Sequence, residues 1–394
     1  MSTCRAAGLA QLLLLVCCLR LCTGLDKTEA DSAGLKYKLS TNAQTADLLV
    51  RPSETTTVSG TSPRSALPQL ATCGCPAAEQ GGKAPGSSVV TAMQSLTAAT
   101  TWTVEQTILL SGQDVFHTEG MVILDNYIYI SAVEVLNRSR AVGRGWLLQF
   151  DLDGGFVDKV ELGEGASYHP GGIDTDGEYI YVPLAEYHAG NACGSVSIAN
   201  CSLPGTSIMY RVTPDLQAER LFTFPDHLGT VAVNGCGPDT QYLDVSNWGS
   251  RTIYRFSLPN GTLIGAANNQ QAFVDFQDCQ SLPGCGLMFC SGVKNLPWQF
   301  PSASNRFVGD QAVGYVNNTV GAQFQMGGLA LVDPTTGIAV TQVPVTAVLT
   351  PGGNILTTNP VWVADSFNRT SGLHFLFAPD SNNGSVVVTR PVTA

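Results

Sequence analysis

Residues 117–132 read HTEGMVILDNYIYISA, and this stretch contains the repeating unit of the chain. His117 stands before the apolar run Met121–Leu124, and the turn residues Asp125 and Asn126 separate that run from a second one, Tyr127–Ala132. Two short apolar runs on either side of a tight turn predict a β-hairpin. Two further runs, at residues 146–151 and 156–162, complete a unit of four short strands.

The unit recurs along the chain in the same register. His117, His169 and His227 each stand before a short apolar run, and they lie 52 and 58 residues apart. A four-stranded propeller blade occupies roughly 40–50 residues, so each histidine is expected to open one blade. The second and third units are expected at 172–174, 179–183, 207–212 and 219–224, and at 230–233, 241–246, 251–257 and 262–265.

The last two units are less regular. Strands are expected at 279–281, 286–291, 328–333 and 339–345, and then at 360–364, 373–378 and 385–392. The fifth unit is one strand short, and the strand at 103–110 is expected to complete it, because propellers close by pairing strands from both termini. We therefore predict an all-β propeller with five four-stranded blades. A sixth blade within residues 292–325 and a two-sheet sandwich are the alternatives.

Composition and charge agree with this fold class and exclude one class of partner. The 394-residue chain has 41 Gly, 21 Pro and only 13% charged residues, which favours an all-β body over a helical one. Its net charge is −11, with no cluster of Lys or Arg. Nucleic acid is therefore not an expected partner, because its phosphates require a basic surface.

The N-terminal region is expected to lie outside the propeller. Residues 1–24 have an early positive charge, a short apolar core and small residues at the end, as in a cleavable secretory signal; a signal anchor is the alternative. Residues 25–100 are rich in Ser, Thr, Ala, Gly and Pro and predict a flexible arm. The propeller domain is expected at 101–394. No later segment is apolar enough over about 20 residues to predict a transmembrane helix.

Two further patterns are typical of a secreted protein. Eight cysteines follow the signal sequence, an even number suited to disulfides, and Cys193–Cys201 and Cys279–Cys290 are the pairs expected from local spacing. A zinc cluster is the competing interpretation, but the paired short spacing of such sites is missing. Asn-X-Ser/Thr sequons, which predict glycosylation, occur at Asn137, Asn200, Asn260, Asn317, Asn368 and Asn383.

The repeat places polar side chains around the expected central axis. His117, His169 and His227 start the first three units, and Asp278 holds the corresponding place in the fourth. Three imidazoles and a carboxylate suit a divalent transition metal such as zinc, iron or copper. Alternatively, His169 acts as a general base with Glu119 or Glu186 as its partner. A solvated polar channel without catalysis is the third interpretation.

Aromatic residues flank the same loops. Tyr168, Tyr187 and Trp248 are expected to form a rim for a small-molecule, glycan or peptide ligand. Packing between blades is the alternative for each of them. His188 and His374 are out of register and receive no role. The sequence lacks a Gly-x-Ser-x-Gly elbow, a phosphate-binding loop and a His-Glu-x-x-His motif.

Several of these stretches resemble a known family. They are residues 117–121 (HTEGM), 168–174 (YHPGGID), 179–187 (YIYVPLAEY), 247–251 (NWGSR), 277–280 (QDCQ) and 290–293 (CSGV). Together they are similar to domain-of-unknown-function family 6454, whose members are uncharacterised and often exported. The resemblance covers residues from about 103 to the C-terminus and implies a propeller-like fold without an established activity. Residues 117–120 depart from the expected His-Pro-Gln-Gly, and residues 116–120 also resemble a repeat start in the five-bladed glutaminyl cyclases.

Three functions follow as hypotheses. The first is a secreted propeller that binds a small molecule or a metal at its axis. The second is an enzyme, either a metal-dependent hydrolase of the lactonase kind or a glutaminyl-cyclase-like protein, which rests on the three histidines. The third is a structural or interaction protein of the extracellular matrix, in which the axis plays no part.

Overall fold

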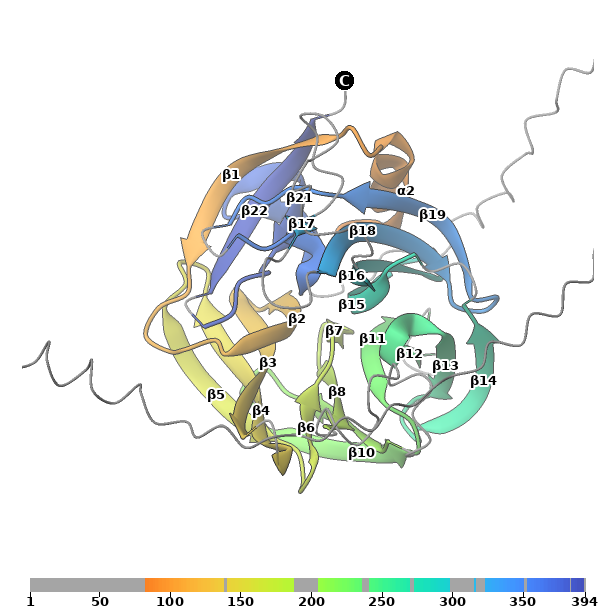
Figure 1. Cartoon of the computed structure of the whole chain (residues 1–394). Helices are drawn as coiled ribbons and strands as arrows, with labels where there is room; N and C mark the ends of the chain where they lie inside the picture. Colours follow the sequence, from red (N-terminus) through yellow and green to blue (C-terminus); the bar gives the residue numbers. More distant parts are fainter. Residues whose placement is uncertain are drawn as a thin grey trace, which may run out of the picture. The chain divides into compact units, whose positions relative to one another are not determined.

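The expected hairpin opens the first of five antiparallel sheets in the computed structural model (Figure 1). Strand β2 (His117–Leu124) pairs with β3 (Tyr127–Asn137), followed by β4 (Val142–Asp151) and β5 (Phe156–Leu162). Asp125 and Asn126 both have positive φ, 51° and 65°, which is the backbone of a type I′ hairpin turn. The structure describes residues 82–137, 140–187, 205–235, 241–269, 273–297, 315–316, 323–350, 353–382 and 384–392.

The second and third blades repeat this order from the axis outward. Blade two contains β8 (Ile180–Glu186), β9 (Ser207–Val212) and β10 (Ala218–Phe224). Its innermost strand is broken into β6 (Ser167–Pro170) and β7 (Asp174–Thr175), which both pair with β8. Blade three follows with four strands in chain order: β11 (Leu228–Asn234), β12 (Tyr242–Asn247), β13 (Thr252–Ser257) and β14 (Thr262–Asn268).

The fourth blade contains the long insertion, and the structure places one short strand of it in the same sheet. Strands β15 (Asp275–Leu282), β16 (Leu287–Pro297), β18 (Gln323–Asp333) and β19 (Ile338–Val345) form the blade. The two-residue strand β17 (Tyr315–Val316) pairs with β18. The described part of the insertion therefore adds to blade four and does not form a sixth blade.

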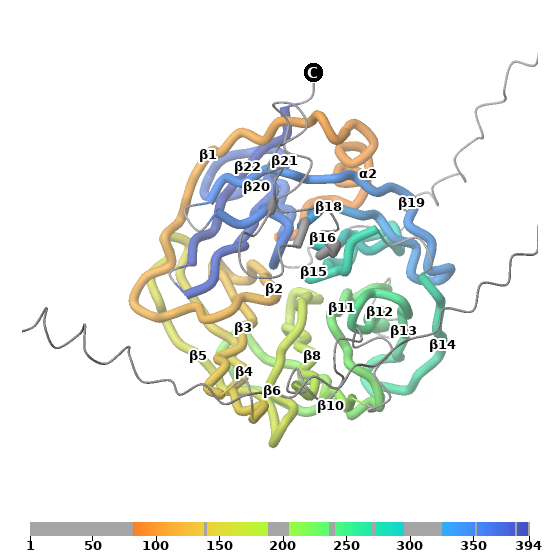
Figure 2. Tube along the Cα trace, viewed as in Figure 1, coloured from red at the N-terminus to blue at the C-terminus, as the bar shows by residue number. Residues whose placement is uncertain are grey.

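The fifth blade closes the ring with strands from both termini. Strands β20 (Val361–Phe367), β21 (Thr370–Phe377) and β22 (Ser385–Val392) are joined by β1 (Thr101–Leu109), which pairs with β22 from Thr101–Val392 to Leu109–Ser385. Figure 2 shows this N-terminal strand alongside the C-terminal one. The prediction of a five-bladed propeller closed by an N-terminal strand is confirmed, and the described strands form neither a sandwich nor a sixth blade.

The end of the stretch expected as a flexible arm is folded onto blades four and five. Helix α2 (Gly86–Ser95) buries Val89 and Met93 in a cluster that also contains Phe289 and Phe375. Just before it, Lys83 forms a β-bridge with Ala364 of β20. The helix therefore packs on the body through its apolar side chains, although it precedes residue 101, where the propeller domain was expected to begin. Residues 1–81 lie outside the described part.

The covalent predictions have mixed outcomes. Cys279 and Cys290 face each other on β15 and β16 and form the expected disulfide, and Cys285 is also disulfide-bonded. Cys193 and Cys201 lie outside the described residues. Of the sequons, Asn137, Asn260 and Asn368 are exposed at the end of a strand or in turns, whereas Asn200, Asn317 and Asn383 are not described. In the described ranges, no helix is long and apolar enough to cross a membrane.

Candidate functional site

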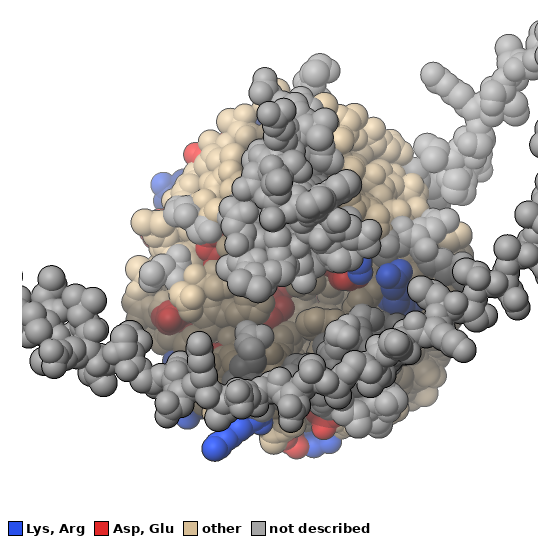
Figure 3. Space-filling view, in the orientation of Figure 1, with Lys and Arg blue, Asp and Glu red and all other residues tan. Residues whose placement is uncertain are grey.

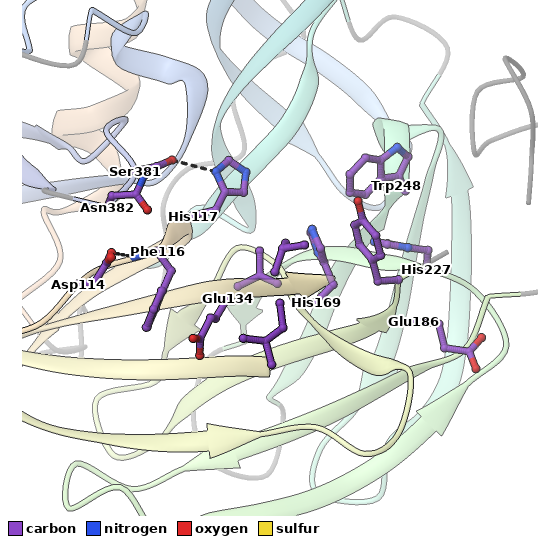
Figure 4. A pocket seen from close by; sticks show the side chains of 14 residues that line it. Asp114, Phe116, His117, Glu134, His169, Glu186, His227, Trp248, Ser381 and Asn382 are labelled. Atoms are coloured by element: carbon purple, nitrogen blue, oxygen red, sulfur yellow. Dashed lines mark hydrogen bonds between the residues drawn. The ribbon is translucent and has the colours of Figure 1, made fainter. Parts of the chain in front are cut away.

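The three repeat histidines meet at one end of the ring. His117 is the first residue of β2, His169 lies in β6, and His227 immediately precedes β11. All three line one hollow, here called the cup, together with Trp248 (Figure 4). Its volume is about 880 Å³, and an adjoining space of about 300 Å³ shares the same four residues. The other residues of the cup are Asp114, Phe116, Val133, Glu134, Val135, Leu136, Glu186, Tyr187, Ser381 and Asn382.

Glu119 links two of the histidines. It lies two residues after His117 on β2, so both side chains point to the same side of the strand. Its Oε1 atom is 3.3 Å from Nε2 of His117 and 3.4 Å from Nε2 of His169. The Glu119 and His169 side chains are more than nine-tenths buried, whereas about half of the His117 side chain is exposed. Nδ1 of His117 also contacts Oγ of Ser381 at 3.0 Å.

Burial displaces the pKa values of this group in opposite directions. Desolvation raises the pKa of Glu119 well above its usual range. Burial lowers the pKa of His169 well below its usual range, and repulsion from His227 and His117 adds to this effect. Both changes favour uncharged forms. At neutral pH, His169 is therefore neutral and has a lone pair available as an acceptor.

Aromatic rings form one side of the cup. The Tyr187 ring stacks on His169, with centroids 5.7 Å apart, and Trp248 packs edge-on against His227 at 4.7 Å. Trp248 belongs to the short 3₁₀ turn η4 (Trp248–Ser250), in which Ser250 has a positive φ of 56°. The Ser250 hydroxyl accepts the N–H of Phe276 at 2.6 Å, which holds the turn against blade four. The turn leaves Trp248 38% exposed to the cup.

The predicted ligand-binding and catalytic residues divide into two groups. Tyr187, Trp248, His169 and Glu186 line the cup, and Glu119 lines the adjoining space. Tyr168 does not line either space: it is buried behind Tyr187, with ring centroids 5.7 Å apart. Glu186 is directed to the backbone, where Oε2 accepts the N–H of Thr206 at 3.0 Å. The carboxylate in contact with His169 is therefore that of Glu119.

Asp278 has a different role from the predicted one. Its fully buried carboxylate accepts three backbone N–H groups, from Met121 at 3.1 Å, Ile173 at 3.0 Å and Val361 at 3.1 Å. These donors belong to three different blades, so Asp278 joins the inner strands instead of extending the histidine group. Within the described ranges, no three His, Cys, Asp or Glu side chains are grouped to hold a metal ion.

A second buried aspartate lies further along the inner strands. Asp174 accepts the N–H groups of Val233 and Ser281, both at 2.9 Å, and its other oxygen is 2.7 Å from Nζ of Lys83. Gly172 lies against Asp278, where a Cβ atom would collide with the carboxylate. Two buried carboxylates, those of Asp174 and Asp278, therefore bind backbone N–H groups of the inner strands and are not part of the histidine group.

Some cup residues were not anticipated from the sequence. Asp114 and Phe116 lie three residues and one residue before His117, so extending the repeat backward by a few residues identifies them. Ser381 and Asn382 lie in the turn before β22, and nothing in their local sequence distinguishes them from other turn residues. Glu134 comes from β3 and reaches the cup because Tyr127–Asn137 extends beyond the apolar run expected at 127–132.

Comparisons with known proteins identify the family of the chain and assign no activity to it. No curated protein matches the chain. Hydrazine synthase from Kuenenia stuttgartiensis is 10% identical over 42% of this chain, which spans about half (52%) of that protein, with a TM-score of 0.28. A DUF4221 family member from Bacteroides vulgatus is 8% identical over 76% of this chain and 100% of its own, with a TM-score of 0.34. A family model matches residues 74–390, and the chain therefore belongs to DUF6454, a family of unknown function.

Proposed function

We propose that the protein binds a small organic molecule in the cup. The observation that carries this proposal is the convergence of three imidazoles, from three successive blades, beside a partly exposed Trp248. The volume of about 880 Å³ is within the range of about 300–1,000 Å³ found for small-molecule sites.

Replacing Trp248 by Ala is expected to weaken ligand binding about two- to tenfold, because loss of a stacked aromatic contact typically costs about 0.5–1.5 kcal/mol. A fragment screen by ligand-observed NMR would first identify binders, and calorimetry would compare wild type with the variant. Leu263→Ala, an exposed apolar residue on the outer strand β14, is the control and is expected to leave affinity unchanged. Equal affinity of wild type and Trp248→Ala for every binder would contradict the proposal.

Acid–base catalysis is a second candidate, and the Glu119–His169 contact favours it. Groups with pKa values displaced in opposite directions in one cleft are typical of a catalytic acid and base. Glu119 would supply the proton and His169 the lone pair, in a hydrolase or a cyclase acting on an ester, lactone or peptide amine. Turnover of a bound ligand that is lost in His169→Gln, with binding retained, is the result that distinguishes this candidate from binding alone.

A bound transition metal is the competing occupant of the three histidines. Elemental analysis of the purified protein beside a His117/His169/His227 triple alanine variant separates the two hypotheses. About one equivalent of zinc, iron or copper in the wild type, lost in the triple variant, would support a metal centre and contradict the organic-ligand hypothesis. Under the third hypothesis, a matrix protein in which the axis plays no part, the triple variant is expected to leave every interaction of the protein unchanged.

We also propose that the protein is secreted and glycosylated. The supporting observations are the predicted signal sequence, the disulfides and the exposed sequons at Asn137, Asn260 and Asn368. Mass spectrometry of protein recovered from the medium of eukaryotic cells is expected to find glycans on these three asparagines. Recovery from the cell interior only, with unmodified asparagines, would contradict this proposal.

A further inference from the structure

The charged residues of the cup are of one sign. Asp114, Glu134 and Glu186 line its wall, and no described Lys or Arg lines either the cup or the adjoining space. Asp275 in the adjoining space is neutralised, because its carboxylate pairs with Lys294 at 2.8 Å. Neither Asp114 nor Glu134 forms an ion pair with a described basic residue; their carboxylates accept the neutral N–H groups of Phe116 and Trp146 instead. Acidic atoms also border the central hollow in Figure 3.

Glu119 has a buried hydrogen-bond acceptor to which no donor is bound. Oε1 of Glu119 is buried and receives no hydrogen bond within the described structure. The two imidazole nitrogens nearest to it are 3.3 and 3.4 Å away, longer than a charge-assisted N–H···O bond of about 2.7–2.9 Å. Since buried polar atoms in native proteins almost always have a partner, this oxygen points to a hydrogen-bond donor supplied by a ligand.

The remaining surface suits a positive group attached to an apolar body. Trp248 is partly exposed, and cations are attracted to the π-face of such a ring. Val133, Val135 and Leu136 add an apolar wall. His169 is neutral, so it accepts a hydrogen bond and does not repel a cation at neutral pH. Carboxylates, π-faces and lone pairs therefore all favour the same sign of charge on the ligand.

We propose that the cup binds an organic amine in its protonated form, with the ammonium N–H groups donating to Oε1 of Glu119 and the apolar part against Trp248 and Tyr187. This inference rests on the proposed small-molecule function and names the ligand class. The positive charge of a bound ammonium would offset the desolvation that raises the pKa of Glu119, and it would favour the ionised carboxylate. Because Oε1 of that carboxylate needs an N–H donor, a primary or secondary ammonium fits, whereas a quaternary one does not.

Four probes with the same phenylethyl or benzyl body test the ligand class on the wild-type protein: 2-phenylethylamine, its N,N,N-trimethyl derivative, 2-phenylethanol and phenylacetate. Calorimetry is expected to show that the primary amine binds at least tenfold more tightly than the alcohol, since a hydrogen bond to a charged group typically contributes about 1.5–3 kcal/mol. Phenylacetate is expected to bind most weakly. Equal or tighter binding of the alcohol, the carboxylate or the quaternary amine, or no binding of any probe, overturns the amine proposal.

Two matched variants test whether Glu119 is responsible for the preference for the amine. Glu119→Gln keeps the shape of the side chain and is expected to reduce amine affinity to that of the alcohol, with alcohol affinity unchanged. Glu161→Gln, at an exposed site on β5, is the control and should change neither. If amine and alcohol bind equally and Trp248→Ala weakens both, the cup remains the ligand site and only the amine class fails. If bound probes are insensitive to Trp248→Ala and to Glu119→Gln, the cup itself is not the site.

Discussion

Asp278→Ala is expected to lower the free energy of unfolding by about 4 kcal/mol or more. The substitution leaves three buried backbone N–H groups without an acceptor, and each such loss typically costs about 1–3 kcal/mol. The donors at Met121, Ile173 and Val361 belong to blades one, two and five, and Asp278 itself to blade four. No other described residue joins the inner strands of four blades through one side chain. Denaturant unfolding followed by circular dichroism measures this change.

Asp275→Ala is the matched control on the same strand. The Asp275 side chain is 30% exposed and pairs with Lys294, so its loss should cost no more than about 1 kcal/mol. Asp278→Asn keeps one oxygen acceptor but places its side-chain NH₂ group against backbone N–H groups. Its loss of unfolding free energy is therefore expected to resemble that of the alanine variant. If the free energy of unfolding of Asp278→Ala lies within about 1 kcal/mol of the wild-type value, the hydrogen bonds of Asp278 are not a main support of the ring.

Lys83→Ala is expected to lower the free energy of unfolding by about 3–5 kcal/mol, because it leaves a buried carboxylate without its cation. Nζ of Lys83 lies 2.7 Å from each of three oxygens, on Asp174, Thr175 and Ser281. Both side chains of the Lys83–Asp174 pair are fully buried. Burial lowers the pKa of Lys83, and Asp174 opposes this change. Thermal and denaturant unfolding of the single variant test the expected loss.

The partly exposed pair formed by Lys294 and Asp275 is the control for Lys83. Lys294→Ala should cost no more than about 1 kcal/mol, because solvent screens a pair in which both side chains are about 30% exposed. The double variant Lys83→Met/Asp174→Asn is expected to be more stable than Lys83→Ala, since it removes both buried charges. Similar losses for Lys83→Ala and Lys294→Ala would show that the N-terminal segment contributes little to the stability of the ring.

The sequence predicted the propeller well because the information that specifies a blade is local. Asp125 and Asn126 set the first hairpin turn, and the apolar runs on either side of it lie in β2 and β3, which meet the turn at the expected residues but extend further at their other ends. Strands β5, β9 and β22 begin and end at the expected residues. The strand near residue 103 could be assigned to the fifth blade because that unit lacked one strand. The number of strands per unit was enough for this assignment, without knowledge of tertiary contacts.

The site was predictable only in part, because its contacts join residues far apart in the chain. The repeat register identified the three histidines. It also placed Asp278 at the equivalent position, and that position alone does not distinguish a metal ligand from a carboxylate that binds backbone N–H groups. Its N–H donors lie 157, 105 and 83 residues away, and no local pattern specifies them. Lys83 was likewise assigned to a flexible arm, because its partner Asp174 is distant in sequence and the neighbouring small residues predict little burial.

The central claim, that the cup is the ligand site, is most directly tested by NMR of histidine ring signals. The chain has only five histidines, and three of them line the cup, whereas His374 is buried in blade five beside Glu105 at 2.9 Å. On titration of ¹³C-histidine-labelled protein with the tightest ligand found, signals of His117, His169 and His227 are predicted to shift while that of His374 stays in place. A saturating ligand that leaves all three cup signals unchanged would contradict the account.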